Sequence, residues 1–300
     1  MRLSTRSLAL GAIIAATAVF LTGCGQSSNA DDGRLTVVAT TTQLGDFARD
    51  VGGDRIVLTQ LLQPNTDPHE YEPTPSDVLA VADADIVLEH GLGLDDWLNQ
   101  VVANAGGSAQ RTVTTTGITA LPSGDPHIWL DPVNAIDMVG AVERALAAAD
   151  PPGADAYRAN ARSLTDRITA LDRELERRIA TIPTDRRKIV TDHDAFGYFA
   201  KRYGIDVVGT TLPSLSTAAQ PSAKQLAELA QTIRAQGVRV VFAEASIDPR
   251  VERALAEEAG VSLGAPLYAD ALGPADTPAS TYLGMMRTNM DAIISGIGTP

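Results

Sequence analysis

The feature that most constrains the fold is an unbroken helical pattern over residues 153–182. Its large apolar side chains recur at spacings of three, four and seven, at Tyr157, Leu164, Ile168, Leu171, Leu175 and Ile179. Prolines frame the segment at 151, 152 and 183. Such a helix is about 40 Å long at 1.5 Å per residue, enough to run the length of a two-domain body. We therefore predict a linker helix between two lobes, at residues 35–152 and 183–300.

Segments that alternate between strand and helix patterns lie on both sides of this helix. Before it, strands are expected at 35–40, 55–62 and 84–90, and helices at 44–52, 76–81 (with Ser76 as N-cap) and 94–105. After it, strands are expected at 188–193, 205–210, 238–244 and 261–270, and helices at 196–204, 221–236, 248–260 and 278–294. This alternation predicts an α/β fold in which each lobe has a mainly parallel sheet flanked by helices.

The first 23 residues are predicted to be a lipoprotein signal peptide. Arg2 and Arg6 precede an apolar run that is too short for a comfortable membrane span, and the run ends in LTGC, which resembles a bacterial lipobox. Cys24, the only cysteine, would then carry the lipid. An ordinary signal peptide with an incidental cysteine is the alternative. The small polar residues 24–34 are expected to tether the folded body to the outer face of the cell membrane.

The charge of the chain excludes one class of partner. Its net charge is −13, and nucleic-acid binding requires clustered Lys and Arg. An acidic surface is compatible with a protein that handles cations. A single cysteine also excludes an intrachain disulfide and, once lipidated, a thiolate ligand or nucleophile.

Two of the four histidines share one local frame. His69 and His127 each follow Asp-Pro, in TDPHEYEP and GDPHIWLDP. Proline fixes φ and biases the preceding residue towards an extended conformation, so each imidazole projects from a stiff loop. Asp67 and Asp125 could accept a hydrogen bond from the backbone or the imidazole and so orient a metal ligand. The repeat favours a shared role over two ordinary loop histidines.

The second half of the chain contributes polar residues at the ends of predicted strands. His193 ends KIVTDH, Glu244 ends VRVVFAE and Asp270 ends VSLGAPLYAD. Ligands of open α/β sheets bind at the carboxyl ends of parallel strands. Each acid taken alone could equally begin a turn or cap a helix.

These residues together suit a transition metal between the lobes. Two imidazoles from one side, with one imidazole and carboxylates from the other, form a plausible ligand set for Zn²⁺ or Mn²⁺. The sequence has no dinucleotide, Walker, nucleophile-elbow or HExxH motif. The fourth histidine, His90, lacks the Asp-Pro frame and is interpreted as a structural or surface residue.

The chain resembles the zinc and manganese receptors among the solute-binding lipoproteins of ABC transporters, a family that includes streptococcal adhesins. The resemblance covers residues 35–295 and rests on the segments TDPHEYEP, GLGLDDWL, DPHIWLDP, TDHDAFGYFAKRYG, FAEASIDPR and LYADALG. It implies one metal ion between two lobes, with the ligands His69, His127, His193 and Asp270. Glu244 matches a family glutamate near the site and is placed behind the ligands.

The resemblance favours Zn²⁺ over Mn²⁺. Manganese members often have Glu where His193 stands. Many zinc members, however, carry a His-rich acidic loop before the second site histidine, and the segment at 104–124 contains no histidine. Mn²⁺ therefore remains the alternative ion.

The predicted function is an extracytoplasmic receptor that captures one metal ion per chain. Its expected partners are an ABC permease with its ATPase, and the membrane through the lipid on Cys24; a monomer is expected. One alternative is a zinc hydrolase with Glu244 as general base, which would need an open metal position for water. The other is a surface adhesin.

Overall fold

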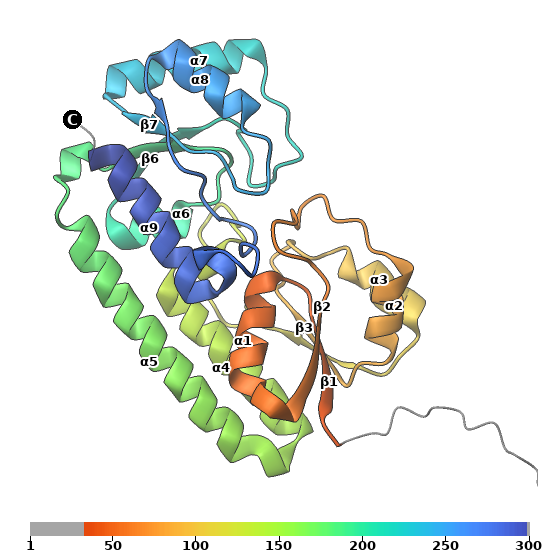
Figure 1. The fold of residues 1–300 in the computed structure, drawn as a ribbon. Helices are drawn as coiled ribbons and strands as arrows, with labels where there is room; N and C mark the ends of the chain where they lie inside the picture. Colours follow the sequence, from red (N-terminus) through yellow and green to blue (C-terminus); the bar gives the residue numbers. More distant parts are fainter. Residues whose placement is uncertain (1–32, 299–300) are drawn as a thin grey trace, which may run out of the picture. The chain divides into compact units, whose positions relative to one another are not determined.

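The computed structural model describes residues 33–298, and within them two parallel sheets stand apart (Figure 1). The first sheet has the order β2-β1-β3-β4, with β1 (Leu35–Ala39), β2 (Ile56–Gln60), β3 (Ile86–Glu89) and β4 (Gln110–Val113). The second has the order β6-β5-β7-β8, with β5 (Lys188–Thr191), β6 (Asp206–Thr210), β7 (Val240–Val241) and β8 (Ser262–Leu263). Every strand pair in both sheets is parallel, which confirms the predicted fold class.

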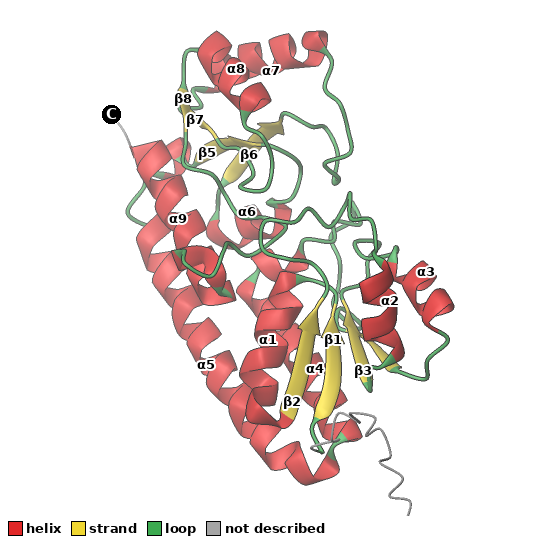
Figure 2. Ribbon diagram, turned by 45° about the vertical axis from the view of Figure 1, so that its right-hand side comes forward, coloured by secondary structure: helices red, strands yellow, loops and turns green. Residues whose placement is uncertain are grey.

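Helices flank both sheets (Figure 2). The first lobe contains α1 (Thr42–Gly52), α2 (Pro75–Ala82), α3 (Leu98–Ala105) and α4 (Pro132–Ala149). The second lobe contains α6 (Gly197–Tyr203), α7 (Ala223–Gln236) and α8 (Arg250–Ala259). Two further helices, α5 (Ala154–Ile179) and α9 (Tyr282–Gly298), run beside one another along both lobes. Within the described part of the chain, no helix is long and apolar enough to cross a membrane.

The long helix forms because its apolar stripe has a core to cover. α5 has 26 residues, and all six apolar positions of the predicted stripe are buried. It packs against α1, α4, α6 and α9. The largest hydrophobic cluster accordingly continues from the first lobe through α5 into the second. The exact lobe boundaries remain a prediction, because this shared core joins the two lobes.

Smaller clusters hold the outer helices. α2 and α3 cover one face of the first sheet through Val81, Leu98 and Val101. α7 and α8 cover one face of the second sheet through Ile233 and Leu255. The carboxyl ends of the strands, and the loops that follow them, are thereby left to meet at the centre of the molecule.

The structure departs from several sequence predictions. The expected strand at 261–270 is reduced to Ser262–Leu263, because Pro266 lacks an N–H for the ladder. Parallel pairing resumes only as an isolated bridge between Leu267 and Glu244. The strand expected at 238–244 is likewise reduced to Val240–Val241. Thr74, not Ser76, caps α2, because its side chain and that of Asp77 form a capping box.

Two elements have no counterpart among the sequence predictions. β4 is an edge strand of largely exposed side chains, so it lacks the apolar pattern of a core strand. α4 begins at Pro132 with Asp131 as N-cap, a recognisable start signal, and buries Met138, Val142 and Leu146.

Candidate metal centre

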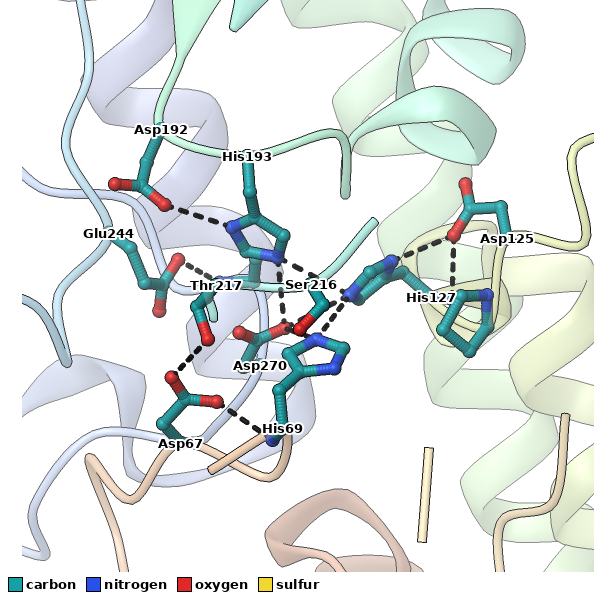
Figure 3. Close-up of polar contacts among 12 residues, drawn as sticks. Asp67, His69, Asp125, His127, Asp192, His193, Ser216, Thr217, Glu244 and Asp270 are labelled. Carbon is teal, nitrogen blue, oxygen red and sulfur yellow. Dashed lines mark hydrogen bonds and ion pairs between the residues drawn. The ribbon is translucent and has the colours of Figure 1, made fainter. Parts of the chain in front are cut away.

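Four side chains meet where the loops of the two lobes face each other (Figure 3). His69 lies between β2 and α2, and His127 lies between β4 and α4. His193 follows β5, and Asp270 lies in the irregular segment after β8. The structure thus brings together the four residues that the family resemblance indicated as ligands.

The spacing of their ligand atoms fits a single ion. One ligand atom from each residue lies within 4.8 Å of all the others. The Nε2 atom of His127 is 3.3 Å from Nε2 of His69, 3.4 Å from Nε2 of His193 and 3.1 Å from Oδ1 of Asp270. Tetrahedral bonds of roughly 2.0–2.1 Å set ligand atoms about 3.3 Å apart. The cluster therefore has the size of a four-coordinate metal site.

The chemistry of the cluster also calls for a cation. Asp270 is buried, and its Oδ1 atom lies 3.1 Å from Nε2 of His127 and 3.4 Å from Nε2 of His193. A buried carboxylate is costly unless a charge offsets it, so the site needs either a protonated imidazole or a cation. A metal ion at the centre of the four ligand atoms would supply that charge.

The second Asp-Pro-His loop holds its histidine from two sides. Oδ1 of Asp125 accepts hydrogen bonds from the His127 backbone N–H (2.9 Å) and from its ring Nδ1 (2.7 Å). With Nδ1 donating, Nε2 keeps a lone pair directed to the centre of the cluster. His127 and Asp125 are both buried.

The first Asp-Pro-His loop is built differently. Oδ1 of Asp67 accepts from the His69 backbone N–H (2.8 Å), and Oδ2 accepts from the Thr217 hydroxyl of the second lobe (2.5 Å). Asp67 therefore fixes the backbone of its loop and reaches across to the other lobe. The His69 side chain retains 8% exposure, whereas the other three members of the cluster are 0–1% exposed.

Sequence reasoning did not identify the support of His193. Oδ1 of Asp192 lies 3.1 Å from the His193 ring Nδ1. Its signal was present, because Asp directly precedes His in TDH, but the spacing differs from the Asp-Pro-His frame. Each of His127 and His193 thus has a carboxylate on the ring nitrogen that faces away from the cluster.

The charges of the cluster are strongly linked. Burial lowers the pKa of His193, but Asp270 and Asp192 outweigh it and raise that pKa well above 6.5. Burial likewise lowers the pKa of His127, yet Asp125 and Asp270 raise it above 6.5. Burial raises the pKa of Asp270, but His193 and His127 bring it well below its ordinary value. Because a metal binds the neutral imidazole, metal binding is coupled to the loss of protons from these histidines.

The segment that carries Asp270 is attached to the first lobe. The Gln43 amide donates to the Asp270 carbonyl (3.1 Å), and the Thr42 hydroxyl accepts from the Leu272 N–H (2.8 Å). The Trp129 indole donates to the Ala269 carbonyl (3.0 Å). Asp270 belongs to the second lobe in sequence, but its position is set by contacts with both lobes.

The remaining candidates lie outside the cluster. Oε2 of Glu244 accepts from the Ala269 N–H (2.9 Å), so Glu244 supports the chain beside Asp270. Its pKa is raised well above its ordinary value by burial and by the charge of Asp270. His90 is completely buried rather than a surface residue, and its Nε2 lies 2.7 Å from the Pro126 carbonyl. Cys24 lies outside the described residues.

Two parallel α/β lobes that share a long helix and face each other across a polar cluster define a solute-binding protein of the bilobal type. Comparison with solved structures agrees. The periplasmic zinc binding protein TroA from Treponema pallidum superposes with a TM-score of 0.83 and 31% identity, over 88% of this chain and 99% of that one.

The family follows from the sequence comparisons. A family model described as "Zinc-uptake complex component A periplasmic" matches residues 37–296. The manganese-binding lipoprotein MntA of Halalkalibacterium halodurans is 32% identical over 95% of this chain and 97% of its own length. The iron-binding protein YfeA of Yersinia pestis is 32% identical over 98% of this chain and 96% of its own length. The chain belongs to this family of metal-binding ABC-transporter lipoproteins, which confirms the resemblance noted in the sequence.

Proposed function

We propose that the protein is the extracytoplasmic receptor of a metal ABC transporter. It captures one divalent transition-metal ion with His69, His127, His193 and Asp270 and delivers that ion to a membrane permease driven by an ATPase. The observation that carries the proposal is the set of four ligand atoms within 4.8 Å of one another. The description of the matching family as a component of a zinc-uptake complex supports transport of metal as the purpose of the site.

We further propose Zn²⁺ as the preferred ion. Three imidazoles and one carboxylate in a compact shell suit tetrahedral Zn²⁺, whereas Mn²⁺ prefers more oxygen ligands and a larger coordination number. Relatives are named for manganese, iron and zinc, so family membership alone does not choose among them. The choice rests on the ligand set of this chain.

A lipid on Cys24 would hold the receptor at the outer face of the membrane, as the word lipoprotein in the names of relatives suggests for them. We also propose that the receptor works as a monomer, because its site is complete within one chain.

The zinc-hydrolase alternative has less support. Four protein ligands fill a tetrahedral shell, whereas a catalytic zinc keeps a position open for water. The small void beside Glu244, lined also by His193 and Phe242, has no volume that a water molecule could occupy. The adhesin alternative has no observation in its favour and remains untested.

Competition between ions tests the proposal. Protein stripped of metal is titrated with Zn²⁺ and with Mn²⁺ against a chelator of known affinity, and the bound ion is counted by elemental analysis. One tightly held ion per chain, with Zn²⁺ bound more tightly than Mn²⁺, is the expected result. Tighter Mn²⁺ would overturn the choice of ion, and failure to bind any transition metal would overturn the function.

A further inference from the structure

Among the hydrogen bonds that join the two lobes around the metal centre, one links the His69 loop to the second lobe. The Thr217 hydroxyl donates to Oδ2 of Asp67. Thr217 lies in the segment 211–222 between β6 and α7, which we call the Thr217 loop. Figure 3 shows Thr217 above Asp67, beside the His69 loop.

The Thr217 loop is attached to the chain around His193. The Leu212 N–H donates to the Asp192 carbonyl (2.8 Å), and the Asp194 N–H donates to the Ser214 carbonyl (2.9 Å). The Thr211 hydroxyl also donates to the Asp192 carbonyl (2.9 Å). A displacement of His193 would therefore carry the Thr217 loop with it.

The other end of the contact is attached to His69. Asp67 holds the His69 backbone N–H through Oδ1, while Oδ2 takes the bond from Thr217. The Asp67–Thr217 bond thus connects the His69 loop to the Thr217 loop, which is itself hydrogen-bonded to the chain around His193, whereas a metal ion would connect His69 to His193 directly. Two links in parallel between the same two lobes strengthen each other, and this coupling is reciprocal.

The Asp67–Thr217 hydrogen bond lies beside the ligand that is nearest to solvent, His69. Its side chain is the most exposed of the four in the cluster, at 8% against 0–1% for the rest. His69 is therefore the member of the cluster nearest to solvent, and we place the exit of the ion beside it. Asp67 and Thr217 are half-buried beside that exit, so their hydrogen bond can break without a rearrangement of the core.

We propose that Thr217 is a positioning residue that clamps the His69 loop to the second lobe and slows release of the bound metal. The inference rests on the proposed function, since it takes the four-residue cluster as the metal site. It adds a residue from outside the ligand set whose contribution is to the rate of dissociation. Such a clamp would hold the ion until a partner separates the lobes.

A pair of variants at one position tests the clamp. Thr217→Val keeps the shape of the side chain and removes the hydroxyl, whereas Thr217→Ser keeps the hydroxyl. Full-length protein loaded with Zn²⁺ is mixed with excess chromogenic chelator, and the rate of zinc release is followed. We expect release from the valine variant to be about tenfold faster than from wild type, and release from the serine variant to stay within about twofold.

A second readout does not depend on metal. Amide hydrogen exchange of the peptide that contains His69 is measured in metal-free protein. Faster exchange in Thr217→Val than in Thr217→Ser supports the clamp whether or not the cluster binds zinc. Absence of zinc binding would overturn only the proposed function. Unchanged exchange and unchanged release in the valine variant would overturn the clamp.

A double-mutant cycle between Asp67 and Thr217 distinguishes loss of their hydrogen bond from a general loss of packing. In an Asp67→Ala background the acceptor is absent, so Thr217→Val should cause no further acceleration of release. Equal acceleration in both backgrounds would assign the effect to packing and overturn the proposal. Thermal unfolding of each metal-free variant confirms that the folded state is intact.

Discussion

The two Asp-Pro-His loops have the same tripeptide and different surroundings. In the second loop, Asp125 holds both the backbone and the ring of His127, and the whole unit is buried. In the first, Asp67 holds only the backbone of His69 and directs its other oxygen to Thr217. The comparison teaches that a repeated motif sets the direction of two side chains, while the packing around each decides how firmly it is held.

The two histidines also differ in their positions within the cluster, and we expect them to have different roles. His127 is central, since its Nε2 atom lies within 3.4 Å of the ligand atoms of the three other residues. His69 is peripheral, at 3.8 Å from Oδ1 of Asp270 and partly exposed. We expect the second loop to determine affinity and the first to determine access.

The largest expected effect is that of acid on affinity, which tests whether both loops supply a ligand. Each histidine must be neutral to bind the ion, and the raised pKa values of His127 and His193 place their protonation above pH 6.5. Affinity should therefore begin to fall near neutral pH and drop by more than about a thousandfold between pH 7.5 and 5.5, approaching a slope of about three.

A competition titration against a chelator of known pH dependence measures that slope. The His69→Ala variant is the matched control, and its slope should approach about two. A wild-type slope near one would mean that most of these histidines are not ligands.

Removal of either histidine should have the next largest effect. The apparent free energy of zinc binding to structural sites is roughly 10–16 kcal/mol. Divided over four ligands it gives about 3 kcal/mol for each, which corresponds to about a hundredfold in affinity. His127→Ala should exceed this value, because His127 is central, and His69→Ala should fall below it. Calorimetry with Zn²⁺ measures both, with Glu70→Gln beside His69 as the control. Equal losses of zinc affinity in His127→Ala and His69→Ala would contradict the different roles expected for the two loops.

Replacement of Asp67 or Asp125 should reduce metal affinity less than removal of a histidine does, and by different amounts in the two loops. Carboxylates behind metal-bound histidines typically contribute about 10–100-fold to affinity. Asp125→Ala should lie near the upper end, since it frees the ring of His127. Asp67→Ala should lie near the lower end and act mainly on the rate of release. The comparison is measured as equilibrium affinity and dissociation rate for each variant, and a larger affinity loss in Asp67→Ala would reverse the assignment.

The smallest expected effect on metal concerns His90. It is buried, packs against Trp129, and its Nε2 atom lies 2.7 Å from the Pro126 carbonyl oxygen. His90 therefore supports the backbone of the second loop and is not one of the four ligands. Its pKa is lowered to about 4, chiefly by burial, so it stays neutral near pH 7. His90→Ala should lower stability by about 2–4 kcal/mol through the cavity it leaves, and change zinc affinity less than about tenfold.

Chemical denaturation of the metal-free protein and zinc calorimetry check the two parts of this prediction. A loss of affinity as large as that of His127→Ala would make His90 a participant in the site.

Local signals were sufficient for much of the fold. The stripe from Tyr157 to Ile179 predicts a long helix because 3.6-residue periodicity is a property of the chain itself. The strand and helix alternation predicts parallel sheets for the same reason, and both predictions are confirmed. The prediction of a strand up to Asp270 was wrong, because from Ala269 onward the path of the chain is set by hydrogen bonds to Trp129, Gln43 and Thr42, which are distant in sequence.

For the candidate site, the stiff Asp-Pro-His frames could be predicted from local sequence, since proline restricts the backbone wherever it stands. The contacts of Asp192 with His193 and of Thr217 with Asp67 arise from the folded arrangement of the chain. The tertiary structure also decided that Asp125 holds the ring of its histidine and Asp67 does not. These contacts depend on how two separate lobes close on one another, and no local pattern specifies a hydrogen bond between residues 150 positions apart.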